Sequence, residues 1–139
     1  MPKTQVRQSS NKSFSSSDDS KRKGRALADA LSFLKEQWGW SGAKIQDVIH
    51  IPATTVNSWI QSGYVNTSDN FSNDVQAILH LIVIHKDLDS MFEQPEDQLL
   101  WLNTFHPDIG EAPLETMKRS IEGLIGIRQY LDYVRGRGA

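Results

Sequence analysis

Apolar residues recur at steps of three and four along almost the whole chain after residue 24. This spacing lines one face of an α-helix, and it predicts helices over residues 25–38, 41–49, 52–62, 74–89, 96–104 and 113–134. Residues 81–84 could instead form a buried strand, but no second strand candidate exists to pair with it. We therefore expect an all-α fold of roughly six to eight helices, with 74–89 as a spine shared by two helical units.

The expected helix ends follow from residues that start or stop helices. Ser41 is suited to cap the second helix, Pro52 to open the third, and Gly63 to end it. Gly123 and Gly126 lie inside the last helical segment. They either divide it into a short and a long helix or allow another helix to approach closely.

Several side chains are assigned to the core or to the surface by their position. In the 96–104 helix, Leu99, Leu100 and Leu102 are expected to face inward. The acidic stretches 87–89 and 93–97 are expected to form a solvated face. Four tryptophans are expected mostly in the core: Trp38, Trp40, Trp59 and Trp101.

Basic residues are concentrated at the start of the chain. Residues 1–25 contain seven Lys or Arg and two Asp, whereas the rest contains eight basic and 15 acidic side chains. Serine dominates residues 1–20, and so few apolar groups cannot offset the entropy cost of ordering. The sequence therefore predicts a disordered basic arm over 1–23, which could contact nucleic acid. The acidic remainder of the chain excludes a uniformly basic protein that coats nucleic acid.

The sequence offers no constellation for catalysis, cofactors or metals. The absence of Cys excludes disulfides and thiolate metal sites. His80 and His85 lie five residues apart, not the four that place two ligands on one helix face. No nucleophile–base pair or Gly-rich phosphate loop occurs. The apolar run 78–84 is far shorter than the roughly 20 residues of a membrane span, so we expect a cytoplasmic protein that is not an enzyme.

Residues 41–60 have the pattern of two short helices joined by a tight turn. Apolar side chains before and after the turn can share one small core, which leaves the start of the second helix free to enter a major groove. The stretch Ile51-Pro-Ala-Thr-Thr-Val-Asn-Ser-Trp59 resembles the helix-turn-helix of Xre/Cro-type repressors. The residues expected to face the groove are Ala53, Thr54, Thr55, Asn57 and Ser58. The phosphate contacts are expected from Lys44, Lys21, Arg22, Lys23 and Arg25.

A second group of residues carries a further resemblance. In chain order they are Trp101-Leu102-Asn103-Thr104, His106-Pro107-Asp108-Ile109-Gly110, Pro113-Leu114-Glu115, Gly123, Ile127 and Leu131. They look like the C-terminal toxin-binding domain of Xre/MbcA/ParS-type antitoxins, over about 88–136. That domain follows a helix-turn-helix in this family, and the two modules occur here in the same order.

The resemblance implies a homodimeric antitoxin of a type II toxin–antitoxin system. It would bind a toxin of the RES class, which consumes NAD or modifies proteins with ADP-ribose, and would repress its own promoter. The implied toxin-binding residues are Trp101, Pro113, Gly123, Tyr130, Tyr133, Arg135, Gly136, Arg137 and Ala139. Family members can block the toxin's active site with the end of the last helix and the C-terminal residues.

Three segments are expected: the arm over 1–23, a helix-turn-helix domain over 24–70 and a toxin-binding and dimerisation domain over 71–139. The alternative is a stand-alone transcriptional regulator without a toxin, whose C-terminal unit only dimerises or binds another protein. An antitoxin should expose an apolar or aromatic patch on the last helix, whereas a pure regulator should bury it in its dimer.

Overall fold

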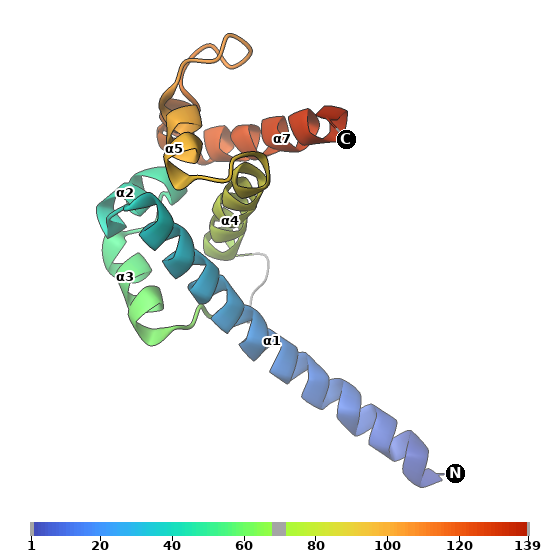
Figure 1. Ribbon diagram of the computed structural model, residues 1–139. Helices are drawn as coiled ribbons and strands as arrows, with labels where there is room; N and C mark the ends of the chain where they lie inside the picture. Colours follow the sequence, from blue (N-terminus) through green and yellow to red (C-terminus); the bar gives the residue numbers. More distant parts are fainter. Residues whose placement is uncertain (1, 68–71, 139) are drawn as a thin grey trace.

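Seven helices make up the described part of the chain (Figure 1). The structure is a computed structural model that describes the backbone of residues 2–67 and 72–138, with side chains from 18 to 67 and from 72 to 136. In chain order the helices are α1 (Pro2–Trp38), α2 (Gly42–Ile49), α3 (Ala53–Ser62), α4 (Asn73–Met91), α5 (Pro95–Asn103), α6 (Pro113–Arg119) and α7 (Ile121–Gly138). The predicted all-α fold is confirmed, and residues 81–84 lie inside α4.

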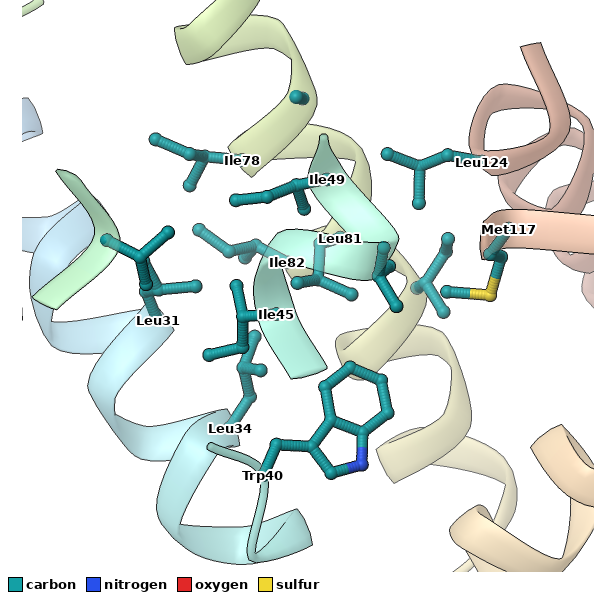
Figure 2. Close-up of a cluster of buried hydrophobic side chains, with 14 of the residues drawn as sticks. Leu31, Leu34, Trp40, Ile45, Ile49, Ile78, Leu81, Ile82, Met117 and Leu124 are labelled. Atoms are coloured by element: carbon teal, nitrogen blue, oxygen red, sulfur yellow. The ribbon is translucent and has the colours of Figure 1, made fainter. Parts of the chain in front are cut away.

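α4 is the central helix, as the sequence predicts. It packs against α1, α2, α5 and α7. Figure 2 shows side chains from five helices meeting in one cluster: Leu31 and Leu34, Ile45 and Ile49, Ile78, Leu81 and Ile82, Met117, and Leu124. One continuous core therefore joins the N-terminal helices to the C-terminal helices, and Trp38 and Trp40 are buried in it. Trp59 and Trp101 are partly buried against it.

α1 extends much further toward the N-terminus than the sequence predicts. The structure has helix from Pro2 onward, where we expected a disordered arm over 1–23. No Pro or Gly lies between residues 3 and 23. A helix that is already nucleated in its packed part can therefore continue through this segment at a low cost per residue. In Figure 1 the first half of α1 projects away from the other helices.

α6 and α7 meet at a break that answers the question left open about the glycines. The break lies at Ser120, whose extended backbone ends α6. Ser120 Oγ accepts a hydrogen bond from the backbone N of Gly123 at 3.0 Å, so it caps the start of α7. Gly123 also permits a close approach, because a methyl group there would overlap the Thr116 carbonyl oxygen of α6. Gly126 has no such neighbour.

α5 turns a different set of residues inward from the set that the sequence predicts. Leu102 is buried and Leu99 is partly buried, but Leu100 is 64% exposed. The inward position is taken by Gln98, which is fully buried. The reason is hydrogen bonding: Gln98 Oε1 accepts from the indole N of Trp38 at 2.8 Å. Satisfying a buried polar network here outweighs the burial of one more leucine.

Candidate functional site

The turn between α2 and α3 is fixed by local hydrogen bonds. Ser41 Oγ accepts from the backbone N of Lys44 at 3.1 Å and caps α2, as predicted. His50 ends α2 in the left-handed conformation, with φ of 62°, which residues other than glycine rarely adopt. Gln46 Oε1 accepts from the backbone N of Ala53 at 2.7 Å. A side chain of α2 therefore holds the first residue of α3.

α3 presents a polar, uncharged face to solvent. Val56 is buried, and Trp59 and Ile60 are partly buried against the core. A methyl group on Gly42 of α2 would lie 2.5 Å from Asn57 Oδ1, so the two helices are in close contact there. Of the five α3 residues expected to contact DNA, Thr54, Asn57 and Ser58 are exposed and Ala53 and Thr55 are half-buried.

The structure brings the predicted basic cluster of α1 close to the end of α3. The backbone N of Val65 donates to the Gly24 carbonyl at 3.1 Å, and Thr67 Oγ1 donates to the Ser20 carbonyl at 3.0 Å. A methyl group on Gly24 would overlap the Val65 carbonyl, which is why glycine is required at this contact. The exposed cations beside this contact are Lys21, Arg22, Lys23 and Arg25.

Arg22 and Lys44, both predicted to contact DNA, interact with neighbouring side chains in the chain. Arg22 forms ion pairs with Asp18 at 3.2 Å and Asp19 at 2.6 Å. Lys44 Nζ lies 6.0 Å from the centre of the Trp40 ring. Because Asp18 and Asp19 neutralise part of its charge, Arg22 contributes less than a full positive charge to the binding of a polyanion.

His50 connects the α2–α3 turn to the C-terminal helices. Its Nε2 lies 3.1 Å from the Met117 carbonyl oxygen in α6. A cavity of about 490 Å³ lies beside this contact, lined by Gln46, Asp47, His50, Ile51, Pro52 and Lys118. The sequence places His50 in a turn but gives no sign of its contact with α6, because the two residues are 67 positions apart.

The loop between α5 and α6 is held by an aromatic cluster. The Trp101 ring lies 4.8 Å from His106 and 6.4 Å from Tyr130, centre to centre. The Tyr130 hydroxyl donates to Asp108 Oδ2 at 3.2 Å, and the Trp101 carbonyl lies 3.0 Å from His106 Nε2. Trp101 and Tyr130, which we expected to bind a toxin, therefore also hold this loop against α7.

The far end of the same loop is fixed by Glu111. Its carboxylate accepts from Thr116 Oγ1 at 2.6 Å and from Arg119 at 2.6 and 3.0 Å. The Thr116 hydrogen bond, with Arg119, lowers the pKa of Glu111. Pro113 begins α6 and is buried. Pro113 and Gly123, both predicted to bind a toxin, thus have structural positions in the α5–α6–α7 packing.

Arg135 forms an ion pair that sequence reasoning missed. It donates to Asp87 Oδ1 in α4 at 2.6 Å. Asp87 is 3% exposed, so the prediction that 87–89 is a solvated face is wrong at this residue. Burial and the neighbouring Asp132 raise the pKa of Asp87, and Arg135 opposes this shift. Two turns earlier on α7, Arg128 donates to His80 Nδ1 at 3.0 Å.

The remaining predicted toxin-binding residues lie at the end of α7. Tyr133 is 60% exposed, and Gly136 is exposed. The Arg137 side chain and Ala139 lie outside the described residues. Two other large apolar side chains, Leu100 and Phe105, are exposed at 64% and 61%. The periodicity of α5 could not identify Leu100, because the pattern marks it as an inward position.

The described ranges 18–67 and 72–136 contain no group of three His, Asp or Glu side chains that could hold a metal ion. In the same part of the chain, no helix is both long enough and apolar enough to cross a membrane.

Comparison with known families places the C-terminal helices in a defined class. Residues 87–137 match the family described as the antitoxin Xre/MbcA/ParS C-terminal toxin-binding domain. The match runs from the end of α4 to the end of α7 and agrees with the 88–136 resemblance seen in the sequence. A search of curated proteins finds no match to the chain.

Proposed function

We propose that this chain, whose residues 87–137 belong to the Xre/MbcA/ParS antitoxin toxin-binding domain family, neutralises a toxin of the RES class and represses its own promoter. The family match carries the proposal, because a toxin-binding domain needs a toxin as its partner. Inhibition by binding requires no catalytic group in this chain. Self-association into a homodimer is part of the same proposal.

The α2–α3 unit supports the DNA-binding part of the proposal. Thr54, Asn57 and Ser58 lie on one exposed face of α3, and such side chains can hydrogen bond to base edges or phosphates. Lys21, Lys23 and Arg25 lie beside the end of α3 and could contact the flanking phosphates. A stand-alone regulator would use the same face, so toxin binding is the property that separates the two functions.

A pull-down of the tagged chain from its native cell lysate tests the toxin-binding part. We expect one stoichiometric partner that consumes NAD or transfers ADP-ribose and is inhibited in the complex. Truncation from Gly136 should weaken that inhibition without unfolding the chain, because the Arg135–Asp87 ion pair is retained. Full inhibition by the truncated chain would exclude a role for the last residues. Recovery of the chain alone would favour the stand-alone regulator.

Substitution of the α1 cations tests the DNA-binding part. We expect Lys21→Gln, Lys23→Gln and Arg25→Gln together to weaken binding to the DNA upstream of the chain's own gene. The logarithmic salt dependence should become shallower by about 0.9 for each phosphate that the variant no longer neutralises. Lys86→Gln, an exposed α4 cation, is the matched control. Substitution is preferable to truncation, because Ser20 and Gly24 bind the segment after α3. Equal slopes for all variants would show that these cations do not contact DNA.

A further inference from the structure

The outer face of α5 carries apolar groups that the fold itself does not bury. Leu100 is 64% exposed and Phe105, just beyond the helix, is 61% exposed. Beside Leu100 lies a groove of about 390 Å³, lined by Phe92, Asp97, Leu100, Trp101, Thr104 and His106. α5 and the loop after it lie at one edge of the molecule, opposite the projecting half of α1 (Figure 1).

The orientation of α5 is fixed, so Leu100 cannot turn inward. Gln98 accepts from Trp38 at 2.8 Å and donates to Asp89 at 3.1 Å and to the Phe92 carbonyl at 3.0 Å. Rotating α5 to bury Leu100 would break all three hydrogen bonds and leave buried polar groups without partners. The fold therefore holds Leu100 in solvent, and neighbouring exposed apolar groups of this kind mark interaction surfaces.

The charge around the groove defines the chemistry of what it binds. Residues 87–117 contain eight Asp or Glu and no Lys or Arg. Glu96 lies one turn before Leu100 and Asp97 one turn before Trp101, so the acids border the apolar strip on the same helix. In contrast to Asp87 and Glu111, the exposed Glu93, Glu96 and Asp97 have no ion-pair partner among the described residues. A partner segment with a basic residue beside an apolar one would satisfy both features.

We propose that the groove lined by Phe92, Leu100 and Trp101 is a docking site for a segment of the toxin that carries an apolar side chain followed by Lys or Arg. The inference rests on the proposed function for the identity of the partner. It adds to it a second contact surface, separate from the end of α7. The apolar side chain enters the groove, and the basic side chain lies against Glu96 and Asp97. This arrangement combines a buried anchor with a charged rim.

A random-peptide phage library selected against the full chain tests the recognition chemistry. We expect enrichment of peptides with adjacent apolar and basic residues. Their affinity should fall roughly tenfold or more in Leu100→Ser and in the Glu96→Gln/Asp97→Asn pair. The matched controls are Phe33→Ser, which removes a side chain that is 53% exposed on α1, and Asp29→Asn/Glu36→Gln. Peptides without this pattern, or equal binding by Leu100→Ser, would overturn the docking site.

The pull-down with the same variants separates this inference from the proposed function. Loss of the toxin with Leu100→Ser but not with Phe33→Ser supports the docking site. Capture of the toxin at wild-type level by Leu100→Ser and Glu96→Gln/Asp97→Asn overturns the docking site and leaves the antitoxin function intact. If the wild-type chain captures no toxin although peptides select the groove, then the proposed function fails and the toxin is not the occupant. Circular dichroism of each variant establishes that the helical fold is retained.

Discussion

Replacing Gly123 by alanine should destabilise the protein by about 1–3 kcal/mol, although alanine is the better helix former. The added methyl group would overlap the Thr116 carbonyl oxygen, and a backbone carbonyl in α6 cannot move aside as a flexible side chain can. The strain would be relieved only by separating α6 from α7. Chemical denaturation of the two proteins measures the effect directly.

Gly126→Ala is the matched control for this prediction. Gly126 lies three residues further along the same helix and is exposed, and a methyl group there has no neighbour within 4 Å. Its replacement should stabilise the chain by up to about 1 kcal/mol, because alanine restricts the unfolded chain more than glycine does. If both substitutions stabilise the protein, then the α6–α7 contact at Gly123 is looser than in this structure. Toxin capture should decline only in Gly123→Ala, through the displaced helices.

The sequence was most informative about features that depend on neighbouring residues. Helical periodicity predicts α2 to α5 to within a few residues, since each helix is set by its own apolar spacing. It predicts one helical segment over 113–134 and does not locate the break at Ser120 that divides α6 from α7. The Ser41 cap was also predictable, because cap and capped residue lie three positions apart. The toxin-binding family was identifiable from its residue order alone and is confirmed over 87–137.

The errors occurred where distant residues decide the outcome. The helical spacing predicts that Leu100 faces the core. The hydrogen bond between Gln98 and Trp38, which lie 60 positions apart in the sequence, instead sets the rotation of α5. Asp87 looks like a surface acid, but Arg135 lies 48 positions away and holds it in the α4–α7 interface. The local pattern predicts a core position for Leu100 and a surface position for Asp87, and tertiary contacts override both predictions. The segment before residue 24 differs in kind: its composition favours disorder, whereas the structure continues α1 through it.

Contacts within the chain also affect how substitutions of the predicted toxin-binding residues are interpreted. Gly123 and Pro113 shape the packing of α6 and α7, and Tyr130 holds the α5–α6 loop through Asp108. Their substitution would weaken toxin binding even if none of them touched the toxin. Leu100, by contrast, is 64% exposed. Variants at this position therefore report more directly on a partner interface.

Replacing Arg135 by methionine should destabilise the protein by roughly 1–3 kcal/mol at pH 7, because Asp87 is then left buried without its cation. Methionine keeps most of the length of the arginine stem, so the loss of charge dominates. The double variant Arg135→Met/Asp87→Asn should recover much of this stability, since an uncharged amide costs less to bury than a carboxylate. A double variant less stable than Arg135→Met would show that Asp87 contributes through other partners.

The pH dependence provides an independent test of the same ion pair. Because burial raises the pKa of Asp87 above its usual 3.8, the folded chain binds more protons here than the unfolded chain. The contribution of Asp87 to the free energy of unfolding therefore falls as the pH rises from its pKa in the unfolded chain to its pKa in the folded chain. Arg135 lowers that folded pKa, so its loss should extend the fall to higher pH. The wild type and Arg135→Met should thus be closest in stability in acid and furthest apart near neutrality.

Arg119→Met provides a comparison for this pH response, because the pKa of its partner Glu111 is lowered whereas the pKa of Asp87 is raised. The Glu111 carboxylate stabilises the folded chain above its unfolded pKa, and this contribution disappears as pH falls through the folded pKa. The wild type and Arg119→Met should therefore converge only at the lower pH at which the half-buried, paired carboxylate of Glu111 is protonated. Parallel stability curves for the wild type and Arg135→Met across this range would mean that Asp87 is not charged in the folded protein. Arg135 would then act only as a hydrogen-bond donor.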